Sequence, residues 1–161
     1  MSKCNECGGQ VEQSIGTYLY DAEGLKVTLQ EVPVTRCDGC GGTGVVIRGI
    51  AKLNRAIASA IIREPGRLLP AEVKFLRKSL GWSGNDLALN LGVDAATVSR
   101  WENGHDPIGP QADRLIRAMV VLESPIPDYA AHNLRNVTKA KREPAPMRFA
   151  RSKSKSWGIV A

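Results

Sequence analysis

The stretch "VKFLRKSLGWSGNDLALNLGVDAATVSRWENG", residues 73–104, decides the fold of the central part of this chain. Its apolar residues fall into short groups at helical spacing, and glycine-containing breaks separate the groups. The first group, Val73, Leu76 and Leu80, predicts an amphipathic helix with one inward stripe. The stretch therefore predicts short helices packed around a shared apolar core.

Capping residues divide the rest of this stretch into two further helices. Ser83 is a favourable N-cap, and Asp86 stands three residues later in capping-box position, so a second helix starts here. Gly92 suits the left-handed end of that helix, Asp94 caps a third helix, and Gly104 ends it. The side chains expected to face inward are Leu87, Ala88, Leu91, Val98 and Trp101.

Two short helices with a tight glycine-containing turn form a helix-turn-helix, whose last helix enters the major groove of DNA. Arg100 on that helix can present its planar fork to O6 and N7 of guanine, and alanine and threonine methyls can touch thymine. Polar residues at the helix ends are expected to bond phosphates. The alternative is a plain helical bundle with Arg100 as a solvated charge. The predicted DNA contacts are Ser83, Asn85, Ala95, Ala96, Thr97, Ser99, Arg100 and Asn103.

A second motif consists of two cysteine pairs, "CNECGG" at residues 4–9 and "CDGCGG" at 37–42. Two residues between cysteines let one tight turn aim two sulfurs at one point, and two such turns supply the four ligands of a tetrahedral zinc site. Between them lie β-rich segments around "DAEG" at 21–24, which predict a hairpin that joins the pairs. With four protein ligands the zinc is structural, and the predicted ligands are Cys4, Cys7, Cys37 and Cys40.

Other uses of the four cysteines stay open. Iron in a rubredoxin-like site has similar ligand spacing and would colour the protein red when oxidised, whereas zinc is colourless. Unligated reduced thiols are a further alternative. A redox pair of the thioredoxin type fits poorly, because the pairs are doubled and no βαβ pattern follows.

Composition and charge divide the chain into three predicted parts. Residues 1–66 are a zinc-binding domain with a β-hairpin and a linking helix from Arg48 to Glu64, and residues 67–123 are the helix-turn-helix domain, which closes with a helix from Pro110. Each of these parts carries seven basic and seven acidic residues. The fold class is therefore α+β: a small β-rich domain followed by an all-α domain.

Residues 124–161 carry eight basic and two acidic residues, and so the whole net charge of +6. Weak periodicity and prolines predict a flexible tail. The tail is either an electrostatic arm that contacts DNA without sequence preference or a solvated segment, and the two alternatives weigh equally.

Several classes of function are not indicated. No segment reaches the 18 or so apolar residues of a membrane helix, and no secretory leader is visible, so a cytoplasmic location without a membrane partner is expected. Neither phosphate-binding nor hydrolase motifs occur, and His105 and His132 are isolated, so no enzyme is predicted.

The order CxxCG, CxxCG and "GVDAATVSRWENG" resembles the MqsA (YgiT) type of zinc-finger and Xre helix-turn-helix antitoxins, over residues 1 to about 123. The resemblance implies a zinc domain that binds a toxin, typically an mRNA-cleaving enzyme. It also implies a homodimeric DNA-binding domain that represses its own promoter at a palindromic operator, with Arg100 in the groove. This chain departs from the Xre pattern at Gly84, where glutamine is common, and at Ala95 and Ala96, where polar residues are common.

Two other functions stay open. The first is a stand-alone zinc-containing transcriptional regulator, for example of a mobile element, without a toxin partner. The second is an iron-bearing electron carrier fused to a DNA-binding module.

Overall fold

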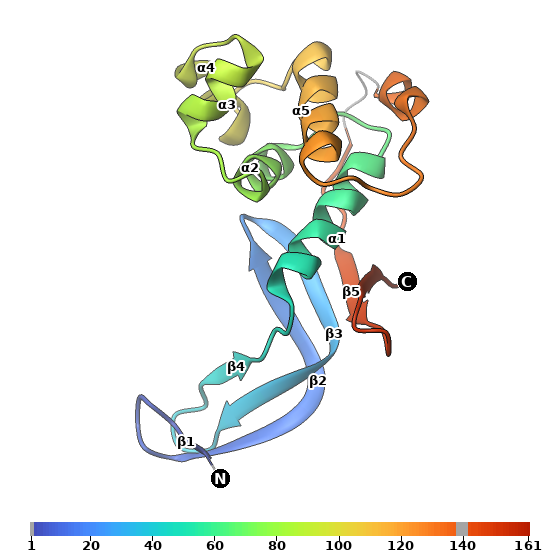
Figure 1. The fold of residues 1–161 in the computed structure, drawn as a ribbon. Coiled ribbons are helices and arrows are strands. Elements are labelled where there is room, and N and C mark those ends of the chain that lie inside the picture. The colour runs from blue at the N-terminus through green and yellow to red at the C-terminus, as the bar shows by residue number, and fades with distance from the viewer. Residues whose placement is uncertain (1, 138–141) are drawn as a thin grey trace. The chain divides into compact units, whose positions relative to one another are not determined.

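The computed structural model describes residues 2–137 and 142–161, and it confirms the α+β class (Figure 1). The chain forms two compact units. The sheet unit comprises Met1–Asp21, Lys26–Leu53 and Pro146–Ala161. The helical unit comprises Ala22–Leu25 and Asn54–Ala145.

A β-sheet with strand order β1-β2-β3-β5-β6 is the framework of the sheet unit, and β4 also pairs with β3. The predicted hairpin is confirmed: β2 and β3 are joined by Glu23 and Gly24, both at positive φ (58° and 87°), as a tight two-residue turn requires. The strands are β1 (Ser2–Lys3), β2 (Gln10–Ala22), β3 (Leu25–Cys37), β4 (Thr43–Val45), β5 (Met147–Arg151) and β6 (Trp157–Ile159).

The prediction of a flexible tail is wrong for β5 and β6. Strand β5 pairs in parallel with β3, with Leu29 opposite Phe149, and β6 pairs antiparallel with β5. Burial explains this order, because Phe149 and Trp157 are 1% and 8% exposed in the core of the sheet unit. Lys139 and Lys141, two of the basic tail residues, lie outside the described residues.

Helices α1 (Ile50–Arg63), α2 (Pro70–Ser79), α3 (Gly84–Leu91), α4 (Ala95–Glu102) and α5 (Pro110–Glu123) occupy the segments where helices were predicted. The linking helix α1 belongs to both units, and its stripe of Leu53, Ile57 and Ile61 is fully buried, whereas Ile50 is 43% exposed. A 3₁₀ helix, η1 (Ala131–Asn136), follows α5.

A buried ion pair holds the helical unit together. Asp113 and Arg117, one turn apart on α5, have side chains that are 0% and 1% exposed, with Nε to Oδ1 at 2.6 Å. Arg117 also donates to the carbonyl oxygens of Ile62, Glu64 and Gly66, and the other Asp113 oxygen accepts from Leu68 N–H at 2.7 Å. These bonds fix the segment between α1 and α2 onto α5.

Within the described part of the chain, no helix is long and apolar enough to cross a membrane.

Candidate metal centre and nucleic-acid interface

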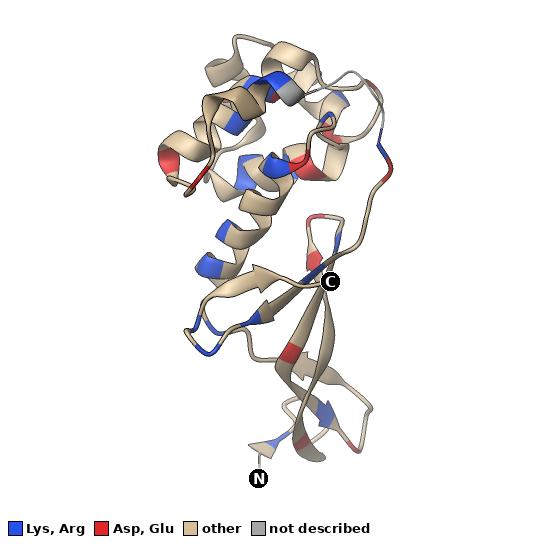
Figure 2. Ribbon diagram, turned by 90° about the vertical axis from the view of Figure 1, so that its right-hand side faces the viewer, with Lys and Arg blue, Asp and Glu red and all other residues tan. Residues whose placement is uncertain are grey.

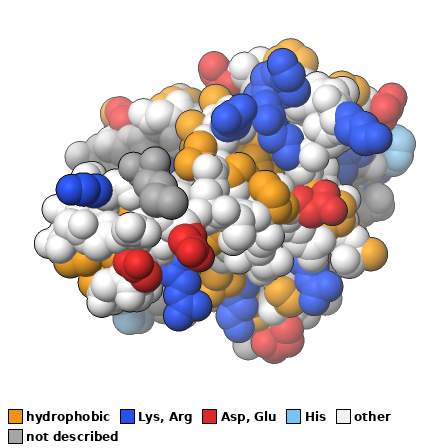
Figure 3. All heavy atoms as spheres, turned by 90° about the horizontal axis from the view of Figure 1, so that it is seen from below, with side chains coloured by type: hydrophobic (Ala, Val, Ile, Leu, Met, Phe, Trp, Pro, Cys, Tyr) orange, Lys and Arg blue, Asp and Glu red, His pale blue; other side chains and the backbone are white. Residues whose placement is uncertain are grey.

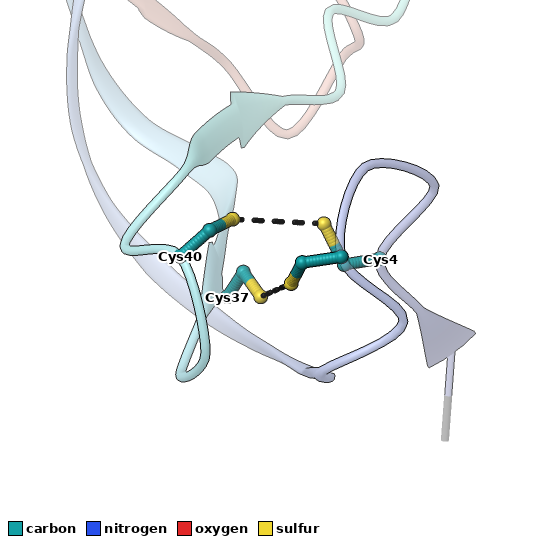
Figure 4. Close-up of side chains that lie close together, drawn as sticks. Cys4, Cys37 and Cys40 are labelled. Carbon is teal, nitrogen blue, oxygen red and sulfur yellow. Dashed lines mark hydrogen bonds between the residues drawn. The ribbon is translucent and has the colours of Figure 1, made fainter.

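The four cysteine sulfurs lie together at one end of the sheet unit (Figure 4). All four Sγ atoms are within 4.8 Å of one another. Cys4 and Cys40 are 3.8 Å apart, and Cys7 and Cys37 are 3.4 Å apart, so neither pair is a disulfide. The hairpin therefore brings the two cysteine turns together, as the spacing predicts.

Local backbone bonds give the two turns the same shape. In the first turn Cys4 N–H donates to Gly9 O and Gly8 N–H donates to Cys4 O, both at 2.9 Å. The second turn repeats this pattern from Cys37, at 2.8 and 3.0 Å. The first glycine of each pair, Gly8 or Gly41, is left-handed, with φ of 74° or 70°.

The second glycine of each pair is required because it passes close to sulfur. A Cβ on Gly9 would lie 3.1 Å from Cys37 Sγ and 3.2 Å from Cys7 Sγ. A Cβ on Gly42 would lie 3.3 Å from Cys40 Sγ. Conformation and space together account for both glycines in each CxxCGG sequence.

The sulfur geometry fits a tetrahedral metal. Ligands 2.3 Å from a zinc ion are about 3.8 Å apart along the edges of a tetrahedron. The separation of Cys4 and Cys40 equals this value, and that of Cys7 and Cys37 is slightly shorter. The four thiols therefore form a site that a soft divalent ion can occupy without rearrangement of the backbone.

The ionisation of the cysteines also favours a cation at the centre of the four-sulfur cluster. The backbone N–H of Cys40, with other hydrogen bonds, lowers the pKa of Cys37 to about 7 against the effect of desolvation. At Cys40 the N–H of Gly42 favours the thiolate, but the other three sulfurs together outweigh it and raise the pKa to about 12. Because neighbouring thiolates repel one another, four of them coexist only around a positive charge.

In the helical unit, α3 and α4 form the predicted helix-turn-helix. Ser83 Oγ accepts from Asp86 N–H at 3.1 Å, and the Asp86 carboxylate accepts from Ser83 N–H at 2.8 Å, which confirms the capping box. Gly92 ends α3 with φ of 67°. Asp94 Oδ1 accepts from Thr97 N–H at 2.7 Å at the start of α4. These caps lower the pKa of both aspartates, Asp86 through Ser83 and Asp94 through the N–H of Thr97.

The helix-turn-helix buries one side of each helix and exposes the other. Val98 and Trp101 of α4 pack inward with Leu87 and Ala88 of α3, as predicted, whereas Leu91 is only half-buried. Of the predicted DNA contacts, Thr97 is half-buried, and the exposed ones are Ser83, Asn85, Ala95, Ala96, Ser99, Arg100 and Asn103.

Two of the predicted phosphate contacts already have partners within the protein. The Ser83 hydroxyl donates to Asp86 Oδ2 at 2.7 Å. The Asn103 amide nitrogen donates to Ser99 O at 2.8 Å and to Ser99 Oγ at 3.2 Å. Both side chains complete helix ends in this structure.

The guanidinium of Arg100 is held in place by an acidic neighbour. Its Nε lies 2.7 Å from Asp106 Oδ2, and the two side chains are 61% and 46% exposed. The ion pair with Asp106 engages Nε, and the side chain of Arg100 stays more than half exposed. The sequence does not reveal this pair, because Asp106 follows α4 in a loop.

Two further residues position α4 and were missed from the sequence. Arg77 of α2 bonds both carboxylate oxygens of Glu102, at 2.6 and 3.0 Å, and donates to Trp82 O at 2.8 Å. The carboxylate of Glu102 raises the pKa of Arg77. Both side chains are nearly buried, at 11% and 12% exposed. Only their tertiary position distinguishes them from surface charges.

Comparison with known proteins supports a helix-turn-helix within the helical unit. Residues 73–128 match the model of a helix-turn-helix family of the Xre type, a segment that contains α3, α4 and α5. No curated protein matches the chain. The family match and the geometry of α3 and α4 indicate a DNA-binding regulator.

Proposed function

We propose that this protein is a sequence-specific transcriptional repressor that binds double-stranded DNA through α4 and holds a structural zinc ion at its four cysteines. The observation that carries the proposal is the pair α3 and α4, with a buried apolar seam on one side and Arg100 on the open side. The pair lies within the segment that matches the helix-turn-helix family.

In this proposal α4 enters the major groove at its N-terminal end. Asp106 holds Arg100 by Nε, and the exposed guanidinium would use its terminal nitrogens to bond O6 and N7 of a guanine. Ala95 and Ala96 are exposed beside it and suit contact with thymine methyls. Base recognition therefore rests mainly on Arg100, with Thr97 and Ser99 as secondary contacts.

Backbone contacts fix the orientation on DNA. Asn85 is exposed in the first turn of α3, and the N-terminal end of a helix suits a phosphate. Ser83 and Asn103 contribute mainly through the helix ends that they cap. A homodimer would present two copies of α4 to a palindromic operator with half-sites about one helical turn apart.

We further propose that the repressor is the antitoxin of a toxin–antitoxin pair. The resemblance in motif order to the MqsA type supports this role. On the sheet unit, Ile15 and Leu19 of β2 are 69% and 73% exposed, an apolar pair on one face that a partner protein can cover. A stand-alone regulator without a toxin is the second candidate, since Arg100 and α4 need no such partner.

DNA binding is tested with a fragment from upstream of the protein's own gene, compared with a random duplex of equal length. The wild type should prefer the upstream fragment, and Arg100→Ala should weaken that binding by about 10–100-fold with loss of the preference. Arg135→Ala removes an equal charge from an exposed site of the same unit and is the matched control. Equal binding of both fragments by the wild type would contradict sequence-specific repression.

The antitoxin role is tested by affinity purification of the tagged chain from its host. A small stoichiometric partner is expected to co-purify with the wild type and with Arg100→Ala. It should be lost when Cys37 and Cys40 are both changed to Ser. Recovery of the protein alone at natural abundance supports the stand-alone regulator.

A further inference from the structure

The ordered end of the chain forms a hairpin whose charge has one sign. Strands β5 and β6 flank a turn at Ser152–Ser156, and the hairpin carries Arg148, Arg151, Lys153 and Lys155. No Asp or Glu occurs after Glu143 in the sequence, so the hairpin has no acidic residue of its own, as Figure 2 also shows.

The hairpin accounts for the net positive charge of the sheet unit. The sheet unit contains nine basic and five acidic residues, and without the four cations of the hairpin the numbers are equal. Among the described residues, none of the four pairs with a carboxylate. Exposed Arg48 lies at the base of the hairpin, because its carbonyl oxygen accepts from Trp157 Nε1 at 3.2 Å. Figure 3 shows several Lys and Arg side chains near one another, with Asp and Glu side chains elsewhere in the same view.

The turn is closed by hydrogen bonds between its own residues. Ser152 N–H donates to Ser156 O at 2.8 Å, and Lys155 N–H donates to Ser152 O at 2.9 Å. The hydroxyls of the three serines meet above the turn: Ser152 lies 2.7 Å from both Ser154 and Ser156, which are 3.1 Å apart. Buried Trp157 and Phe149 anchor the two strands to the core. Lys153 and Lys155 therefore alternate with three serines whose hydroxyls cluster together.

The conformation of Lys155 points to a role for its side chain. Its φ is 63°, in the left-handed region that this turn position normally gives to glycine or asparagine. A lysine there is strained, and such residues concentrate at functional sites. The side chain of Lys155 is exposed at the tip of the hairpin.

We infer that the β5–β6 hairpin is a second nucleic-acid contact, which binds phosphodiester oxygens through Lys153, Lys155 and the three serine hydroxyls. Phosphate oxygens accept from hydroxyl and ammonium donors alike, and such contacts position a protein without specifying sequence. The choice of DNA over another polyanion rests on the proposed function, because the same chain carries the helix-turn-helix. The site itself lies in the sheet unit and does not use α4.

The test uses the full zinc-loaded chain, a random DNA duplex, the upstream fragment and a series of salt concentrations. Lys153→Gln with Lys155→Gln should weaken binding to both duplexes about tenfold and reduce the slope of log affinity against log salt by about two. Lys3→Gln with Lys26→Gln removes the same charge from exposed sites of the same unit and should leave the slope unchanged. Equal slopes for the two double variants would overturn the inference.

A second variant separates charge from folding. Lys155→Gly suits the left-handed turn, so the Tm should rise by about 2–4 °C while DNA binding weakens. A Tm that rises with unchanged affinity would also overturn the inference, since the ammonium group would then have no role. If poly-glutamate, but not duplex DNA, binds through Lys153 and Lys155, the partner is an acidic protein and the inference is wrong.

Failure of the hairpin inference and failure of the proposed repressor function would give different results. Arg100→Ala should abolish the preference for the upstream fragment and leave the effect of the hairpin lysines on the random duplex intact. A wild type without any preference would contradict the repressor. The slopes measured on the random duplex would still decide the role of the hairpin.

Discussion

The cysteine end of the sheet (residues 2–11 and 35–45) and the helix-turn-helix (residues 83–103) are ordered by different forces. None of the described residues from Ser2 to Asp21 is buried, so the cysteine end has almost no apolar core of its own. The helix-turn-helix instead buries Leu87, Val98 and Trp101. Small regions that cannot bury apolar surface depend on cross-links or metals, and the four clustered sulfurs are suited to such a metal.

Removal of the metal should give the largest difference between the two regions. Structural zinc sites contribute about 10–16 kcal/mol in small metal-dependent folds, so chelation should abolish amide protection at residues 2–11 and 35–45. Protection in α2–α5 should persist. Hydrogen exchange with mass spectrometry measures both in one sample. Parallel loss of protection in the helices would show that the metal supports the whole chain.

Breaking the buried ion pair should destabilise the helical unit and leave the metal site unchanged, which is the converse of metal removal. Asp113→Ala leaves the Arg117 cation buried without its partner and should cost about 3–5 kcal/mol of unfolding free energy, measured by urea denaturation. The double change Asp113→Leu and Arg117→Met should recover much of that loss. Glu123→Ala, exposed on the same helix, is the control and should change stability by less than about 0.5 kcal/mol. Zinc affinity should be unaffected by all three changes.

Glycine substitutions in the helix-turn-helix test whether a glycine is required by its backbone conformation or by a lack of room for a Cβ atom. A Cβ on Gly92 would meet no atom within 4 Å, so Gly92→Ala is costly only through its φ of 67°, by about 1 kcal/mol. Gly84 also has open space but lies in the first turn of α3, so Gly84→Ala should raise stability by up to about 1 kcal/mol. Thermal unfolding separates the two, and equal effects would contradict the left-handed role of Gly92.

Acidification should have the smallest effect on stability. As the pH falls, it should affect the cysteine end before the helix-turn-helix. The N–H of Thr97 lowers the pKa of Asp94 in the folded state, so the cap stabilises α4 at neutral pH and is lost as pH falls through that lowered value. The difference in Tm between the wild type and Asp94→Ala should therefore vanish only below about pH 4. Protons displace zinc from thiolates, so the cysteine end should open first as pH falls. A cap effect that disappears at higher pH than zinc release would contradict this order.

Local sequence signals were sufficient where the interacting residues are close in the chain. The capping box at Ser83, the left-handed Gly92 and the cap at Asp94 each depend on residues at most four apart, and all three are confirmed. The cysteine turns were predictable for the same reason, because CxxCGG is a self-contained turn. Their meeting followed from the hairpin between them, whose turn is also local.

The tertiary structure alone decided the rest, because those contacts join distant segments. Strand β5 pairs with β3 across more than a hundred residues, and Arg117 bonds the segment after α1, so neither carries a periodic signal. Asp113 and Arg117 have the spacing of an ordinary surface pair, yet packing buries both. The sequence by itself determined the helices, their caps and the two cysteine turns, which depend on near neighbours. Long-range packing decided which charges are buried and which basic residues stand together at the surface.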